Sequence, residues 1–241
     1  DAITGRVFWK YRHVPADNAL VCCGANNRGV AVLGDKVFMG TLDARLVALD
    51  RTNGQPLWNV EVGDVSLAYS VTMAPLAVKD KIIVGVGGGE YGIRGYVAAY
   101  DANTGKQAWK TYTIPGPGEP NHDSWQGDDW KHGGAPVWIT GSFDPDLNLT
   151  YWGVGNPGPD WNAGQRPGDN LYSDSVIALD ADTGELKRFW GAYGNVPNDD
   201  DLGAYNPSAP PSQQFRNPVH CADPTDDGFV YVCDRPGDRI Q

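Results

Sequence analysis

One short motif recurs along this chain and limits the folds that it can adopt. An aspartate opens a polar stretch that ends in glycine, at residues 1–5, 50–54, 101–105 and 180–184. A tryptophan follows four residues after the glycine in three copies, at Trp9, Trp58 and Trp109, and Arg188 takes that place in the fourth. Asp, Asn, Thr and Gly favour turns. The opening aspartates are 49, 51 and 79 residues apart, so the last interval carries an insertion. A recurrence of roughly 50 residues is typical of β-propeller blades, so each copy is expected to join two strands.

A second repeat lies between the copies of the first. Residues 34–40 and 79–85 each consist of a polar turn followed by an apolar stretch that suits a buried strand. Two strand pairs per period indicate four-stranded antiparallel blades, whose radial packing leaves only short exposed edges. The chain is therefore predicted to be all-β, a β-propeller, with its repeated tryptophans packed between neighbouring blades.

The sequence changes in character after the fourth motif. Residues 195–216 are polar and rich in proline, and a loop of that length is unusual inside a compact domain. We expect a boundary near Arg188. Residues 1–187 would form about three to four blades. Residues 188–241 would be either a divergent segment or a continuation of the same propeller.

Composition excludes some classes of function. The formal net charge is −11, with no basic run, which argues against nucleic acid or an anionic membrane as partner. No apolar stretch is long enough to span a bilayer. Residues 1–5 resemble the middle of a domain, so either a leader has been removed or sequence upstream is missing. Four cysteines permit an oxidising compartment without requiring one.

Two of the four cysteines, Cys22 and Cys23, are adjacent. Disulfide bonds normally join residues whose Cα atoms are about 4.4–6.8 Å apart, whereas the Cα atoms of neighbouring residues are only about 3.8 Å apart. A disulfide between Cys22 and Cys23 would therefore close a small, strained ring. Strain of this kind tends to persist where function needs it. The alternative is that the two cysteines pair separately with Cys221 and Cys233. Four cysteines allow three connectivities, and the sequence leaves the choice open.

A glycine-rich stretch at residues 87–92 has the spacing of a dinucleotide-binding loop. The residues that follow, 94–100, have the pattern of a strand, so no helix N-terminus is available for a pyrophosphate. We therefore reject a nicotinamide site. What remains is a loop that could approach a ligand closely and that presents one carboxylate, Glu90.

Oxygen ligands for a hard cation are the second chemical signal. The side-chain oxygen of Asn156 follows a strand and, with Glu90 and ligand oxygens, would suit Ca²⁺. An Asn before Pro is also a common turn residue, and that structural use stays open. Another polar group lies at His122, Asp123, Asp128, Asp129 and His132. Its spacing matches no compact zinc motif, which favours solvated loop charges.

Together these stretches resemble the quinoprotein alcohol dehydrogenases, the methanol and ethanol dehydrogenase family that uses pyrroloquinoline quinone. The resemblance covers residues 1–187 and rests on the cysteine pair with residues 27–29, residues 40–46, 90–96 and 130–138, and residues 155–157, in family order. It implies an eight-bladed propeller with the quinone on its axis, of which this chain contains only part of the ring.

The resemblance implies a role for each matching residue. Cys22 and Cys23 would form a vicinal disulfide over one face of the quinone, and Trp138 would stack on the other. Arg28 would pair with a quinone carboxylate. The residues expected to line the cofactor are Thr72, Gly87, Gly88 and Gly89. Glu90 and Asn156 would bind Ca²⁺ or a lanthanide ion, which acts as a Lewis acid on the quinone carbonyl.

The implied function is a periplasmic or secreted oxidoreductase. It would oxidise a primary alcohol by hydride transfer to the metal-bound quinone, with a cytochrome c as electron acceptor, and the resemblance also allows a homodimer. Two other readings stay open: a non-catalytic propeller that binds partners, and an inactive fragment of a larger dehydrogenase.

The sequence departs from the family pattern in two places. The catalytic aspartate of the family lies in a Trp-Asp-Tyr-Asp type segment, and residues 197–204 occupy that place here without the Trp and Tyr. Asp199 and Asp201 are the candidates for the catalytic base. Residues 189–241 also resemble an NHL-repeat propeller protein.

Overall fold

The computed structural model describes residues 1–160, 162–198, 200–216 and 218–240, and it is built from β-sheets. The first sheet has the order β1-β2-β3-β4: Ala31–Leu33, Lys36–Gly40, Arg45–Asp50 and Pro56–Glu61. The second has the order β5-β6-β7-β8: Leu76–Val78, Lys81–Gly85, Tyr96–Asp101 and Gln107–Tyr112. Every neighbouring pair in both sheets is antiparallel.

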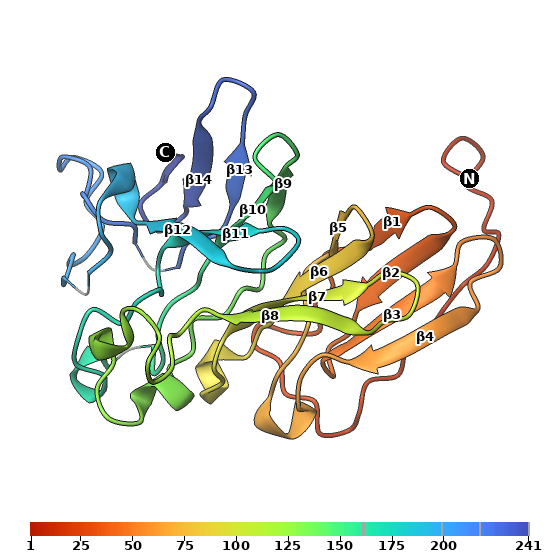
Figure 1. Ribbon diagram of the computed structural model, residues 1–241, viewed down its shortest axis with the longest axis horizontal. Helices are drawn as coiled ribbons and strands as arrows, with labels where there is room; N and C mark the ends of the chain where they lie inside the picture. Colours follow the sequence, from red (N-terminus) through yellow and green to blue (C-terminus); the bar gives the residue numbers. More distant parts are fainter. Residues whose placement is uncertain (161, 199, 217, 241) are drawn as a thin grey trace.

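Two further sheets follow. The third has the order β12-β11-β10-β9, with β9 Ser142–Asp144, β10 Leu149–Gly153, β11 Val176–Asp180 and β12 Leu186–Trp190. The fourth has three strands: β13 Ala222–Pro224, β14 Val230–Asp234 and β15 Arg239–Ile240. In Figure 1 the second sheet lies between the first and the third. Four-stranded antiparallel blades are thus confirmed for the first three sheets.

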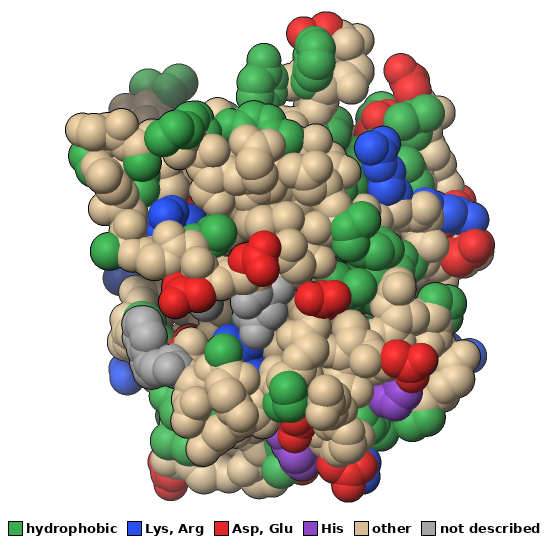
Figure 2. All heavy atoms as spheres, turned by 90° about the vertical axis from the view of Figure 1, so that its left-hand side faces the viewer, with side chains coloured by type: hydrophobic (Ala, Val, Ile, Leu, Met, Phe, Trp, Pro, Cys, Tyr) green, Lys and Arg blue, Asp and Glu red, His purple; other side chains and the backbone are tan. Residues whose placement is uncertain are grey.

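Helical structure consists of single 3₁₀ turns in the loops. They are η1 Val65–Leu67, η2 Gly89–Tyr91, η3 His122–Ser124, η4 Asp129–Lys131, η5 Ala163–Gln165 and η6 Ala192–Gly194. Within the described ranges, no helix has the length and apolar character needed to cross a membrane. On the face in Figure 2, acidic side chains are scattered and no continuous basic patch appears among the described residues, as the net charge leads us to expect.

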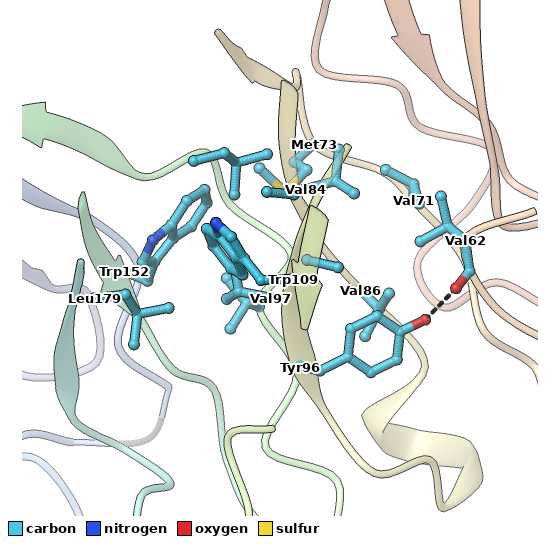
Figure 3. Close-up of a cluster of buried hydrophobic side chains, with 14 of the residues drawn as sticks. Val62, Val71, Met73, Val84, Val86, Tyr96, Val97, Trp109, Trp152 and Leu179 are labelled. Atoms are coloured by element: carbon cyan, nitrogen blue, oxygen red, sulfur yellow. Dashed lines mark hydrogen bonds between the residues drawn. The ribbon is translucent and has the colours of Figure 1, made fainter. Parts of the chain in front are cut away.

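The core lies between the sheets and explains why the inner strands are apolar along their whole length. Residues 96–100 of β7 are all buried, because one sheet face packs on the first blade and the other on the third. Figure 3 shows this cluster, in which Val97, Trp109, Trp152 and Leu179 approach from two blades. The Tyr96 hydroxyl satisfies its hydrogen-bonding need by donating to the Val62 carbonyl, 2.5 Å away.

The recurring tryptophans connect successive blades through one repeated contact. Each indole nitrogen donates to a backbone carbonyl in the next copy of the motif: Trp9 to Arg51 (2.9 Å), Trp58 to Ala102 (3.2 Å) and Trp109 to Ala181 (3.3 Å). Each indole also covers the glycine of that next copy, Gly54, Gly105 or Gly184. A Cβ at Gly105 would lie 2.9 Å from the Trp58 ring, and φ is +72° there. The expected packing of these tryptophans between blades is confirmed.

The fourth copy breaks this pattern. Arg188, which replaces the tryptophan, stacks its guanidinium over Trp190 on the same strand, 5.1 Å from the ring centroid. The C-terminal residues contact the third blade through a buried hydrophobic cluster, not through a tryptophan that covers a glycine. Phe215, Val219 and Val232 share a buried cluster with Tyr151 and other residues of that blade. Residues beyond Arg188 therefore pack directly on the third sheet.

Residues 1–30 form an extended strap without regular strands, and several contacts, including those of Trp9 and His13, fix it to the first blade. Trp9 packs on a small buried cluster of that blade. His13 lies 2.8 Å from Asp43, whose other carboxylate oxygen accepts from the Ala16 amide at 3.1 Å. Thr41 also donates to Asp43. The strap matters because it positions the adjacent cysteines.

We expect Trp109→Ala to lower the free energy of unfolding by about 3 to 5 kcal/mol, the usual cost of truncating a buried tryptophan. Trp109 is 7% exposed, and the change removes its contact with Gly184 and its hydrogen bond to Ala181. Urea unfolding measures the change. Leu147→Ala, at a residue that is 63% exposed, is the control and should stay within about 0.5 kcal/mol of the parent. Equal effects of the two substitutions would contradict the role given to the indole.

We expect Asp43→Asn to destabilise the protein at neutral pH by roughly 1 to 3 kcal/mol, since it weakens hydrogen bonds to a buried carboxylate. Burial alone would raise the pKa of Asp43, but hydrogen bonds from Thr41, His13 and Ala16 outweigh it and lower the pKa. The stabilisation is therefore full above the unfolded pKa of about 3.9 and is lost as the pH falls below it.

Urea unfolding of parent and Asp43→Asn at pH 7 and at about pH 3 tests this expectation. Asp146→Asn, in the exposed turn between β9 and β10, provides the control for a lost surface charge. A difference between parent and Asp43→Asn that stays constant across this pH range would show that the carboxylate charge contributes nothing.

Candidate functional site

A cavity of about 670 Å³ opens where the loops of several blades meet. The candidates from the sequence that line it are Cys22, Cys23, Arg28, Thr72, Gly87, Gly88, Glu90, Trp138 and Asn156. They come from the strap, from the loops that precede β5 and follow β6, from the segment before β9, and from the loop between β10 and β11. Gly89 lies in the same loop as Glu90, packed beneath it against Pro136. The structure thus brings together candidates that are far apart in the sequence.

Close packing explains why the loop before Glu90 is made of glycines. Gly87 exchanges backbone hydrogen bonds with Ser70 at 2.9 and 3.2 Å. Gly88 has φ of +116°, and a Cβ there would collide with the Ala68 carbonyl. A Cβ at Gly89 would lie 2.8 Å from the Pro136 ring. The tight turn places Glu90 in η2 at the edge of the cavity.

Arg28 is fixed at the cavity through its own backbone and through its neighbour. Its amide donates to the Thr72 carbonyl at 3.0 Å, and its guanidinium reaches the same oxygen at 3.3 Å. The Asn27 side chain donates to the Gly40 carbonyl at 2.9 Å, which ties this part of the strap to β2. The Arg28 guanidinium also lies over the Trp138 ring, 5.1 Å from its centroid. A cation and a flat indole therefore share one wall.

Trp138 also contacts the C-terminal segment. The His220 ring packs edge-on against the indole, with centroids 4.8 Å apart. Burial lowers the pKa of His220, and the charges of Arg235 and Arg28 act in the same direction, against a hydrogen bond to the Pro218 carbonyl. The imidazole is accordingly neutral at pH 7. With Arg28 and Arg235, it forms a part of the cavity that suits an anionic group.

A second group of side chains is acidic and contains Glu90, Asn156 and Asp160. The Asn156 amide nitrogen donates to Asp160 Oδ1 at 2.6 Å. Burial raises the pKa of Asp160, and the charge of Glu90 raises it further, whereas the Asn156 hydrogen bond and Arg166 lower it. The Glu90 carboxylate and the Asn156 amide oxygen are donor types that Ca²⁺ and similar hard cations prefer, and Asp160 adds a second carboxylate to this acidic corner of the cavity.

The cysteines do not all follow expectation. Cys221 and Cys233 are bonded to each other, so separate pairing of Cys22 and Cys23 with them is wrong. Cys22 and Cys23 are free thiols, and the vicinal disulfide that the resemblance implies is not formed in this structure. The hydrogen bond with the Cys23 side chain, then burial, then the nearby Glu90 raise the pKa of Cys22 to about 12.

Of the two candidates for the catalytic base, the structure describes Asp201, which does not line this cavity. Asp199 lies outside the described residues. Asp201 is exposed and lines a separate hollow of about 600 Å³ with Tyr205 and Arg239, where it accepts a hydrogen bond from the Gly203 amide at 2.8 Å. Its role therefore stays a prediction from the resemblance.

The polar group of residues 122–132, in and around η3 and η4, makes hydrogen bonds to nearby backbone carbonyls. His122 bonds to the Pro115 carbonyl and His132 to the Gly92 carbonyl, each at 3.0 Å. Among the residues that the structure describes, no three His, Cys, Asp or Glu side chains gather in a cluster that could bind a metal by themselves. A cation at Glu90 and Asn156 would thus need further oxygen ligands.

Sequence reasoning missed several residues that line the cavity, namely Asn26, Ser70, Asp160, Pro218, His220 and Arg235. Asp160 could have been predicted from the sequence, because it follows Asn156 after a short Pro-Gly-Pro turn that brings the two side chains together. His220 and Arg235 gave no signal, because they lie in the segment that we assigned outside the family resemblance.

The chain belongs to a known family, as comparison with other proteins shows. Residues 1–235 match the family described as glucose/ethanol/alcohol dehydrogenase, beta-propeller domain, which is the family of the PQQ-dependent enzymes. The resemblance seen in the sequence is confirmed. The match also continues past Arg188.

Individual relatives support the same assignment. The quinohemoprotein alcohol dehydrogenase ADH IIB of Pseudomonas putida is 48% identical over 77% of this chain and 29% of its own length. The lanthanide-dependent methanol dehydrogenase of Methylacidiphilum fumariolicum (strain SolV) is 40% identical over 94% of this chain and 41% of its own length. This chain therefore spans less than half of these relatives.

Solved structures agree with the propeller fold. A europium-containing methanol dehydrogenase superposes with a TM-score of 0.74 at 35% identity, covering 98% of this chain and 44% of that protein. A quinohemoprotein alcohol dehydrogenase from Comamonas testosteroni gives a TM-score of 0.67 at 34% identity, over 89% of this chain and 34% of that protein. The predicted all-β propeller architecture, present as part of a ring, is confirmed.

We expect Glu90→Gln to lower the pKa of Cys22, because it removes a nearby negative charge that disfavours the thiolate. In reduced protein, alkylation of Cys22 by iodoacetamide should therefore reach its half-maximal rate at a lower pH. Mass spectrometry of the peptide containing both cysteines follows the reaction at each. Glu185→Gln, in the turn between β11 and β12, is the control. Identical pH profiles for the parent and Glu90→Gln would contradict this contact.

Proposed function

We propose that this chain is part of a periplasmic alcohol dehydrogenase that uses pyrroloquinoline quinone and Ca²⁺ or a lanthanide ion. The observation that carries the proposal is the meeting of Cys22, Cys23, Arg28, Glu90, Trp138 and Asn156 around one cavity. Sequence separation alone would not bring them together. The family to which the chain belongs supplies the reaction class.

The residues of the cavity fit such a cofactor. A flat, anionic, polycyclic ligand needs an aromatic side chain to stack on, a cationic partner and a cavity large enough to hold its rings. Trp138 provides the first and Arg28 the second, and about 670 Å³ is within the usual range of 300–1,000 Å³ for small-molecule sites. The acidic corner fits a hard cation, since burial and then the charge of Glu90 raise the pKa of Asp160 when no cation is near.

Each side chain has a distinct part in this proposal. Trp138 stacks on the ligand, and Arg28, fixed by Thr72, neutralises one of its carboxylates. Glu90 and Asn156 provide oxygens to the cation. When bound, the quinone supplies a two-electron acceptor for a primary alcohol, and the cation supplies Lewis acidity. Cys22 and Cys23 lie side by side at the same cavity, and the loss of two electrons and two protons to an external thiol oxidant would form the vicinal disulfide that the resemblance implies.

We further propose that residues 188–241 continue the same propeller. Phe215 and Val219 share a buried cluster with the third blade, and His220 and Arg235 line the cavity. Two relatives, from Methylobacterium organophilum and Methylorubrum extorquens, are named methanol dehydrogenase [cytochrome c] subunit 1. We extend a cytochrome c acceptor, and assembly as a homodimer, to this chain on that basis and on the resemblance.

A propeller that binds a ligand without catalysis is the second candidate. The position of Asp201 in a separate hollow favours it, because proton removal from an alcohol needs a base at the cavity. Absence of alcohol-dependent turnover in protein that binds the quinone would support this candidate, or an incomplete fragment of a larger enzyme.

We expect purified protein supplied with the quinone and Ca²⁺ to reduce an artificial electron acceptor when a primary alcohol is added. Glu90→Gln should lower that rate by about 100-fold, since Lewis-acid stabilisation is worth several kcal/mol and about 1.4 kcal/mol changes a rate tenfold. Glu185→Gln should leave the rate unchanged. Fluorescence titration of the quinone, through quenching of tryptophan emission, checks binding separately. Failure of quinone binding by a correctly folded protein that contains the complete propeller would exclude the proposed function.

A further inference from the structure

Asp160 lines the acidic corner of the cavity but has no role in the resemblance. It lies four residues beyond Asn156, at the end of a short turn, and it is partly buried. Its Oδ1 accepts a 2.6 Å hydrogen bond from the Asn156 amide nitrogen. A bond of this length to an ionised carboxylate is among the stronger hydrogen bonds in proteins.

This hydrogen bond determines which way the Asn156 amide points. The amide nitrogen donates to Asp160 and, at 3.3 Å, to the Pro157 carbonyl. The opposite orientation would place the amide oxygen against the carboxylate, where two acceptors repel each other. The oxygen of Asn156 is therefore turned away from Asp160, and it is the amide atom that can bind a cation.

The negative charge of Asp160 also affects how strongly the site at Glu90 and Asn156 would attract a cation. Glu90, Asn156 and Asp160 line the same cavity, and Asp160 is in direct contact with Asn156. A second carboxylate next to the first favours binding of a cation, and the electrostatic gain grows with the charge of that cation.

We infer that Asp160 is a positioning residue of the cation site: it orients the Asn156 amide, and its charge makes the corner prefer a trivalent to a divalent ion. The inference rests on the proposed function, because it assumes a cation at Glu90 and Asn156. Asp160 acts through Asn156 and through its charge, without direct coordination.

Metal titration tests the inference without using enzyme activity. Tb³⁺ binding is followed by luminescence sensitised by tryptophan, and Ca²⁺ binding by competition against Tb³⁺. Asp160→Asn keeps a hydrogen-bond acceptor for Asn156 and loses the charge, whereas Asp160→Ala loses both. Asp146→Asn, in the exposed β9–β10 turn, removes a charge elsewhere and should change neither affinity.

Removal of the charge should weaken binding of both ions, by about 10-fold or more for Ca²⁺, as is typical for residues that support a metal ligand. Coulomb energy is proportional to ion charge, so a 10-fold loss for Ca²⁺ corresponds to about a 30-fold loss for Tb³⁺. The preference for Tb³⁺ should thus fall about threefold in both variants. Asp160→Ala should bind Ca²⁺ more weakly still than Asp160→Asn, because only the latter can orient Asn156.

The possible outcomes distinguish the role of Asp160 from the proposed function on which it rests. If the parent binds the ions and Asp160→Asn keeps the same preference for Tb³⁺, the inference is wrong and the proposed function stands. Equal Ca²⁺ affinities for the Asn and Ala variants would exclude the orienting role. A folded parent that binds neither ion would overturn both the inference and the cation site.

Discussion

The contact between an indole and the glycine of the next blade is the interaction on which this structure depends. The indole ring packs on the glycine, while the indole nitrogen donates a hydrogen bond to a backbone carbonyl of the same turn. Both contacts fix the distance between neighbouring blades. Because the glycine lacks a side chain and has a positive φ, the tryptophan of the preceding blade can lie flat on the turn. Repetition of the contact sets the angle between sheets, and that angle decides whether loops from different blades reach a common centre.

The centre that results has an uneven charge distribution. Arg28 and Arg235, with the neutral His220 packed against Trp138, make one part of the cavity suitable for anions. Glu90 and Asp160 make another part suitable for a cation. A ligand that carries carboxylates and chelates a metal would match both parts in one orientation only. Charge separation, more than shape, therefore accounts for how such a cavity would orient its ligand.

The sequence predicted the repeated part of the structure well and the irregular part poorly, for physical reasons. Trp9, Trp58 and Trp109 follow a local rule, a turn with a glycine and then a tryptophan, and local rules can be recognised without three-dimensional contacts. Most cavity residues came from the resemblance, and the structure brings them together. His220 had no local signature, since its position depends on packing between residues 215–232 and the third blade. The pairing of cysteines likewise depended on distances that only the fold supplies.

The strap that carries Cys22 has a consequence for assembly of the site. It comes from the first 30 residues, whereas His220 and Arg235 come from the last 25 or so, and both must reach Trp138. Contacts between such distant parts of a chain form late, because closing long loops costs entropy before any contact rewards it. The ligand pocket would accordingly be among the last regions to mature, when the blades are already in place.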